Sequence, residues 1–130
     1  IPFPNKVSFI SQNWKKYPAL IQDSTLVTKI IDIEKTINGR AYYYIPKEKV
    51  LPFAGQIKTG DIILITTKKK GLDTAHVGIA IENEGQIYLL HASVSDKKVS
   101  ITTETLPDYL QRITSHSGIM IGRLINFKSN

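Results

Sequence analysis

The sequence contains no cysteine, and this absence excludes more than any other feature of its composition. Disulfide scaffolds, zinc ribbons, iron–sulfur sites and thiolate chemistry carried within these residues all require cysteine sulfur. A chain of 130 residues buries roughly two thirds of the surface that its unfolded form exposes, so it needs neither a metal nor a disulfide for stability. Because this length is too short for two ordinary domains, we expect a single globular domain over residues 1–130.

Long apolar runs are missing as well. No stretch approaches the roughly 18 apolar residues that a membrane span requires. The start, from Ile1 to Pro4, has neither the basic nor the apolar part of a signal peptide. The sequence also opens without Met, which leaves room for a leader or a larger N-terminal portion upstream.

A concentrated basic surface is also lacking, although the chain is basic overall. Seventeen Lys and Arg against eleven Asp and Glu give a net charge of +6. The basic residues are scattered, and Lys68–Lys70, the only run of three, has no interleaved aromatic residues. We therefore expect this run to be a solvated loop and expect no nucleic-acid partner. A nucleic-acid binder stays as a remote alternative that predicts steep salt dependence of binding.

The pattern that is present favours a sheet. Asn38-Gly39 separates two runs rich in Ile and Tyr, which predicts a hairpin with a type I′ turn over residues 30–44. The apolar, β-branched run Gly60–Thr66 predicts a central strand. Further strands are expected over residues 75–82, 86–93 and 118–125, and short helices over residues 8–17, capped by Ser8, and 105–113, capped by Thr105. We expect an α+β fold with a mainly antiparallel sheet of five or six strands and few short helices.

Two of the three histidines lie on the hairpin formed by residues 75–93. If its turn holds an even number of residues, His76 and His91 share one face of the sheet and lie opposite or diagonally adjacent. The expected open face reads His76, Gly78, Ala80, and the expected core face reads Val77, Ile79, Ile81. Two neighbouring imidazoles suit a relay, in which one is a general base and the other fixes its tautomer and orientation.

The residues around this pair leave the nucleophile open. Ser93 and Thr74 carry hydroxyls close to the histidines in sequence, but neither lies on a nucleophile elbow or at a helix N-terminus, so hydrogen bonding and turn formation are their expected roles. A metal site would need a third ligand, for which only Asp73 or Glu82 is near, so we expect none. His116 lies between two serines and is expected to be an exposed loop residue without a role.

Three blocks together resemble a known group of enzymes. They are Gly60-Asp61-Ile62-Ile63, Ala75-His76-Val77-Gly78-Ile79-Ala80 and Leu90-His91-Ala92-Ser93. These blocks resemble the core strands of the NlpC-type, papain-like cell-wall cysteine peptidases. The approach Gly71-Leu72-Asp73 and the ending, with Val99, Tyr109-Leu110 and Gly118-Ile119 to Arg123, are similar to the N-acetylmuramoyl-L-alanine amidase-like branch.

The resemblance implies roles for several residues. It makes His76 the catalytic base and His91 the residue that orients it, and we name Asp73, Thr74 and Ser93 as candidate substrate contacts. The family's nucleophile is a cysteine at the N-terminus of a helix that packs on the sheet, and no such cysteine is present here. We therefore expect a papain-like core without its nucleophile helix, as the C-terminal part of a longer protein whose N-terminal lobe carries the Cys. A paralogue that has lost the nucleophile, or a lobe supplied by another chain, stays open.

The function that the resemblance implies is hydrolysis of peptidoglycan, most simply at the bond between N-acetylmuramic acid and L-Ala. The alternatives are cleavage between γ-D-Glu and the diamino acid, and an inactive cell-wall-binding module. Peptidoglycan fragments are the expected partners and no cofactor is expected. The implied location is the bacterial periplasm, or a secreted or cell-envelope protein. Without the nucleophile helix, the face with Gly78, Ala80, Ile87 and Leu89 is expected to be uncovered and to allow dimerisation.

Overall fold

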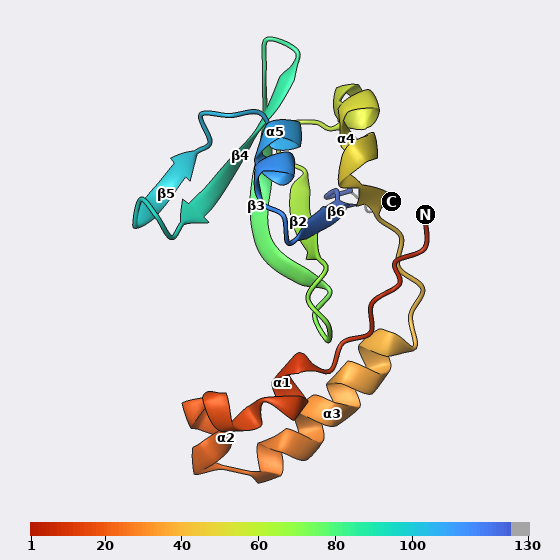
Figure 1. Cartoon of the computed structure of the whole chain (residues 1–130), viewed down its shortest axis with the longest axis vertical. Coiled ribbons are helices and arrows are strands. Elements are labelled where there is room, and N and C mark those ends of the chain that lie inside the picture. The colour runs from red at the N-terminus through yellow and green to blue at the C-terminus, as the bar shows by residue number, and fades with distance from the viewer. Residues whose placement is uncertain (126–130) are drawn as a thin grey trace, which may run out of the picture.

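A computed structural model describes residues 1–125 as an α+β fold, in which six antiparallel strands carry short helices and a separate helical arm (Figure 1). The strands are β1 (Ile45–Pro46), β2 (Ile62–Thr67), β3 (Thr74–Asn83), β4 (Gln86–Ser93), β5 (Lys98–Ile101) and β6 (His116–Gly122). The α-helices are α1 (Phe9–Gln12), α2 (Pro18–Gln22), α3 (Thr25–Asn38), α4 (Lys47–Phe53) and α5 (Leu106–Arg112). Short 3-10 helices cover Trp14–Lys16 and Ala54–Gln56.

The sheet has the strand order β1-β6-β2-β3-β4-β5, with every pair antiparallel. The expected hairpin of β3 and β4 is confirmed, and its turn is the two-residue Glu84-Gly85. Both residues have positive φ, 51° and 76°, as a type I′ turn requires. Because the turn is even, the register keeps the two strand histidines on one face of the sheet.

The core lies on the histidine face, which corrects the expected assignment of the two faces. Ile63 and Leu89 on this face are fully buried, whereas Val77 and Ile79 on the opposite face are 52% and 42% exposed. Gly78 does not open the sheet to a ligand: a Cβ there would lie 2.5 Å from Leu89 Cδ1, so the space is already filled by the neighbouring strand.

Two helices account for the buried face. Helix α4 contributes the buried Val50, and α5 contributes Leu106 and Leu110, all three fully shielded from water. The expected α5 is confirmed with its N-cap, since the Thr105 side chain accepts a hydrogen bond from the Asp108 backbone N–H. Helix α4 has Pro46 at its N-cap position and contains Pro52.

The prediction of an uncovered face that allows dimerisation is therefore wrong. Gly78, Ala80, Ile87 and Leu89 lie in the core beneath the helices. Within the sheet, exposed apolar side chains such as Val77 and Ile79 are on the other side.

The prediction of a hairpin over residues 30–44 is also wrong, because α3 runs to Asn38. Leu26, Ile30, Ile33 and Ile37 recur at helical spacing, and this pattern outweighs the turn preference of Asn38-Gly39. Gly39 ends the helix with φ of −77°, so its conformational freedom is not used.

The helical arm of α1, α2 and α3 projects away from the sheet (Figure 1). Ser8 occupies the N-cap position of α1. The helix expected over residues 8–17 is divided into α1 and a short 3-10 helix, and Pro18 begins α2. Glu34 is 6% exposed and accepts hydrogen bonds from the Ser11 backbone and hydroxyl, which ties α3 to α1. The backbone carbonyl of Gly71 accepts from two amides at the start of α1 and connects the arm to the sheet.

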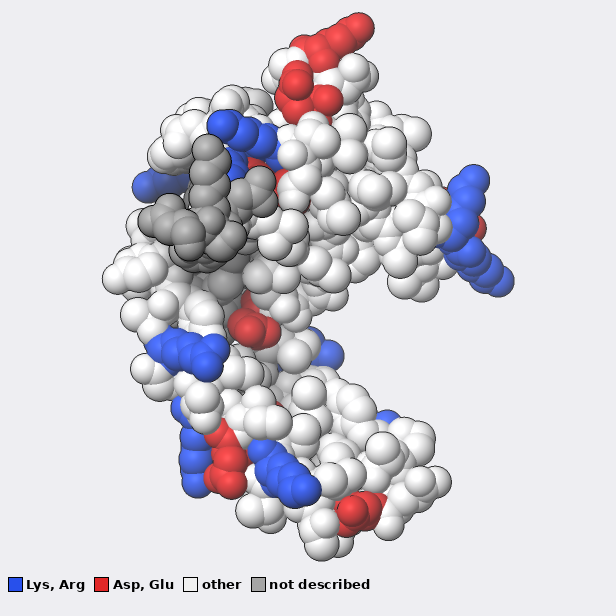
Figure 2. All heavy atoms as spheres, turned by 180° about the vertical axis from the view of Figure 1, so that it is seen from behind, with Lys and Arg blue, Asp and Glu red and all other residues white. Residues whose placement is uncertain are grey.

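Seen from behind, the molecule is C-shaped, with a notch between the arm and the sheet, and its charges are spread over both parts (Figure 2). Across residues 1–125, none of the helices combines the length and the apolar character needed to cross a membrane.

Candidate active site

The candidate active site is built on two histidines from neighbouring strands. His76 lies near the start of β3 and pairs with Ile65 of β2, and His91 lies near the end of β4 and pairs with Ser100 of β5. The register in which Ile79 faces Leu90 places the two histidines diagonally on one face. Their rings meet edge to face, with centroids 5.0 Å apart and an interplanar angle of 87°.

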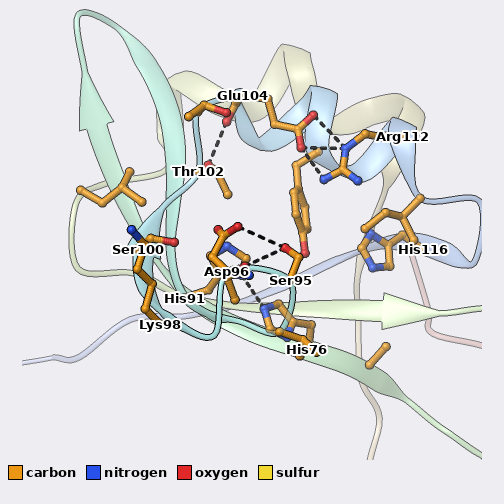
Figure 3. A pocket seen from close by; sticks show the side chains of 17 residues that line it. His76, His91, Ser95, Asp96, Lys98, Ser100, Thr102, Glu104, Arg112 and His116 are labelled. Carbon is orange, nitrogen blue, oxygen red and sulfur yellow. Dashed lines mark hydrogen bonds and ion pairs between the residues drawn. The ribbon is translucent and has the colours of Figure 1, made fainter.

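A hydrogen bond couples the two rings. His76 Nε2 and His91 Nδ1 lie 2.7 Å apart, so one nitrogen donates and the other accepts (Figure 3). When His76 Nε2 carries the proton and donates it to His91 Nδ1, His76 Nδ1 keeps a free lone pair. The hydrogen bond to His91 then holds the ring of His76 in that tautomer. His76 then has the form of a general base and His91 the form of its orienting partner.

The surroundings keep His76 uncharged near neutral pH. Burial of the ring, followed by the charge that His91 can carry, lowers the pKa of His76 below its usual value of 6.5. A neutral imidazole can accept a proton, so this direction agrees with the role of a base.

Tyr109 of α5 extends the cluster of rings. Its ring meets His91 edge to face at 5.7 Å and lies 5.6 Å from the ring of His116 at an angle of 35°. Burial raises the pKa of Tyr109, so its hydroxyl keeps its proton. Arg112 lies over this ring at 5.3 Å and is held by Glu104 through hydrogen bonds of 2.8 and 2.5 Å.

His116 was expected to be an exposed loop residue, and the structure contradicts this. It begins β6, pairs with Thr67, and is only 4% exposed. The two flanking serines suggested a loop. Strand β6 instead begins at His116, two residues before Gly118, and Tyr109 of α5 packs against the imidazole.

These rings line an open cleft of about 850 Å³. Its lining comes from β3, β4, β5, α5 and the start of β6, and Figure 3 shows the labelled side chains arranged around the opening. Chemically informative members of the lining are His76, His91, Ser95, Lys98, Arg112 and His116. The cleft is therefore mostly polar around a pair of coupled imidazoles.

Of the three candidate substrate contacts, one lies in this cleft and two lie outside its lining. Ser93 lines the cleft and shares a hydrogen bond of 3.0 Å with Ser95. Asp73 and Thr74 lie outside its lining, where the Asp73 carboxylate accepts from the Thr74 backbone N–H at 2.7 Å. Within residues 1–125, no group of three His, Cys, Asp or Glu side chains is placed to hold a metal ion.

Sequence reasoning missed Tyr109, Arg112 and His116. The helix that carries the first two was expected, but its position over the histidine face depends on tertiary packing. Tyr109 took part in the family resemblance without a site role. A local signal was the spacing of three residues between Tyr109 and Arg112, which places them on one side of a helix.

The fold and the site define an α+β protein with an antiparallel sheet that presents a coupled histidine pair to an open cleft. Residues 5–119 match the N-acetylmuramoyl-L-alanine amidase-like (AmiA-like) family, and the chain belongs to this family. No curated protein matches the sequence.

Solved structures support the same assignment of the fold. An N-acetylmuramoyl-L-alanine amidase from Bacteroides uniformis is 36% identical with a TM-score of 0.85, and the match covers 93% of this chain and 52% of that one. A protein described as a putative xylanase from Bacteroides fragilis is 35% identical with a TM-score of 0.84, covering 93% and 53%. A Legionella pneumophila protein shares the fold alone, at 24% identity and a TM-score of 0.51. The chain thus spans about half the length of its two more similar relatives.

Proposed function

We propose that this chain is the histidine-bearing half of a peptidoglycan amidase of the cysteine type, with the thiol supplied by protein outside these 130 residues. The carrying observation is the 2.7 Å contact between His76 Nε2 and His91 Nδ1 at the wall of a cleft. Membership of the amidase-like family and the likeness to the B. uniformis amidase support the substrate class.

The proposed reaction assigns one step to each group. His76 Nδ1 takes the proton of the thiol, and the thiolate attacks the amide carbonyl carbon. The C–N bond breaks, the amine leaves with the proton from His76, and a thioester remains. His76 then takes a proton from water, whose oxygen attacks the thioester, and the thiol is restored with the release of a carboxylic acid. His91 keeps the ring of His76 aligned throughout.

The proposed bond is the amide between N-acetylmuramic acid and L-Ala, and the γ-D-Glu to diamino-acid bond is the second choice. Peptidoglycan lies outside the cytoplasm, so the proposed place of action is the cell envelope. An inactive wall-binding module on the same fold differs in one respect: it would bind muropeptides without cleaving them.

The test compares two proteins against purified peptidoglycan. The 130-residue chain is expected to release no product, because neither Ser93 nor Thr74 is placed as a nucleophile. A longer natural protein that contains this chain together with a cysteine-bearing segment is expected to release peptides with a free N-terminal L-Ala. His76→Ala in that longer protein is expected to slow release by about 10²-fold or more, as loss of a general base does.

Alkylation of the cysteine provides the control, since it blocks a thiol and leaves the histidines in place. Cleavage by the 130-residue chain alone, or full activity of the alkylated or His76→Ala protein, would contradict the proposed mechanism. Release of peptides that begin at the diamino acid would move the proposal to the second bond.

A further inference from the structure

His116 is a buried titratable side chain that the proposed mechanism does not use. It is 4% exposed, yet its ring belongs to the lining of the same cleft as His76 and His91 (Figure 3). Within the part of the chain that the structure describes, its Nδ1 atom is shielded from water and has no hydrogen-bond partner. A buried polar atom without a partner is unusual and calls for a functional or physical reason.

The position of Nδ1 decides which tautomer the ring adopts. A proton on Nδ1 would bury an N–H donor without an acceptor, which is costly and rare in folded proteins. The proton therefore belongs on Nε2, and Nδ1 keeps a lone pair. Since the ring lines the cleft while Nδ1 is shielded, Nε2 is the nitrogen left to face the cleft.

The groups around His116 also oppose its protonation. Tyr109 packs against the ring from α5. Lys47 of α4 and Arg112 of α5 carry positive charge, and His76 of β3 adds charge whenever it is protonated. Burial, followed by these charges, lowers the pKa of His116. The ring is thus a neutral donor of a single hydrogen bond at neutral pH.

We propose that His116 binds the substrate by donating a hydrogen bond from Nε2–H to an amide carbonyl oxygen of the muropeptide in the cleft. This inference rests on the proposed function, which supplies the substrate class. His76 and His91 carry the proton chemistry, and His116 binds the peptide from its position beside Tyr109 without changing its own charge.

Binding of N-acetylmuramoyl-L-alanyl-D-isoglutamine to the 130-residue chain is the test, measured by calorimetry at pH 7.5. His116→Phe removes the donor and is expected to weaken binding by about threefold to tenfold, the loss of one hydrogen bond. His116→Gln places an N–H donor near the position of Nε2 and is expected to bind within about twofold of wild type. His116→Asn, whose amide reaches only the position of Nδ1, is expected to behave like His116→Phe.

The nitrogen NMR shifts of His116 in the wild-type chain give a second readout that does not depend on ligand. They are expected to show the neutral Nε2–H tautomer at pH 7.5 and a titration midpoint below the usual pKa of His. Thermal unfolding of each variant identifies any that fails to fold, and the tautomer measurement needs no variant.

Each contrary result has its own meaning. Equal binding by wild type and a folded His116→Phe, or an Nδ1–H tautomer, would overturn this inference and leave the proposed function intact. Absence of muropeptide binding by the wild-type chain would contradict the proposed substrate class and the inference with it.

Discussion

At the residue scale, Asp61 is a buried carboxylate just before β2, with a side chain that is 2% exposed. Arg123 donates to both of its carboxylate oxygens at 2.6 Å, and the Lys58 backbone N–H donates at 2.8 Å. The guanidinium of Arg123 is the main reason that the pKa of Asp61 lies below its usual value. Asp61→Asn is expected to lower the free energy of unfolding by about 2 kcal/mol, less than for a fully buried pair because Arg123 is half exposed.

Urea denaturation measures this loss, and Asp32→Asn is the matched control. Asp32 forms an exposed pair with Lys35 at 3.8 Å, so its replacement is expected to change stability by less than about 0.5 kcal/mol. Equal effects of the two substitutions would show that the Asp61 pair contributes no more than a surface pair.

The half-buried His76 and the buried His116 lead to a prediction for the pH dependence of stability. Burial lowers the pKa of both His76 and His116 in the folded chain, while the unfolded chain keeps values of about 6.5. As pH falls below about 6.5, the unfolded state therefore takes up protons that the folded state does not, and stability decreases.

Unfolding free energies at pH 7.5 and 5.5 test this direction, in a range above the titration of most carboxylates. His116→Gln is expected to show a smaller decrease than wild type, because one of the two groups is gone. A wild-type chain that becomes more stable at pH 5.5 would contradict both pKa directions.

The sequence allowed the histidine pair to be predicted because strand alternation and an even turn depend only on local spacing. His76 and His91 share a face for that reason. The roles of Tyr109 and His116 could not be predicted, since their contacts depend on how α5 lies across the sheet.

At the element scale, the strands were predictable and the faces of the sheet were not. The continuous β-branched run of residues 60–66 predicted β2, and the segments 75–82 and 86–93 predicted β3 and β4. Apolar residues stand on both faces, so alternation could not identify the core. The helix α3 was mistaken for a hairpin because Asn38 suits a turn. The Asn38 side chain instead accepts a hydrogen bond from the Val7 N–H at 2.7 Å and donates one to the Val7 carbonyl at 2.8 Å.

Two adjacent isoleucines of β2 test the corrected faces. Ile63 is fully buried beneath the helices, and Ile62 is 37% exposed on the other face. Ile63→Ala is expected to cost about 3–4 kcal/mol of unfolding free energy, and Ile62→Ala about 1 kcal/mol. If Ile62→Ala were the more damaging change in urea denaturation, the face assignment would be wrong.

At the scale of the whole molecule, the solvent-facing side of the sheet is unusually apolar. A cross-strand row of Ile62, Ile79, Leu90 and Ile101 runs over four strands, and three of its four side chains are between 37% and 51% exposed. Contiguous apolar surface of this kind binds apolar dyes. Composition and length could not reveal it, because an exposed face and a core face contain the same residue types.

Ile79→Lys is expected to reduce the binding of an apolar fluorescent dye with little change in stability, because Ile79 is 42% exposed. Ile21→Lys is the matched control on the helical arm, where Ile21 is 57% exposed and lies outside the row. Equal dye binding by wild type and Ile79→Lys would show that this face is not the apolar surface of the molecule.

The most direct test of the account is a nitrogen NMR titration of His76 in wild type and in His91→Phe. The variant keeps a ring edge toward Tyr109 but removes both nitrogens. We predict that wild-type His76 is an Nε2–H tautomer with a midpoint below about 6.5, and that the midpoint rises in the variant, where the charge of His91 is gone. A wild-type midpoint near 6.5 that His91→Phe leaves unchanged would contradict the coupled pair on which the proposed function depends.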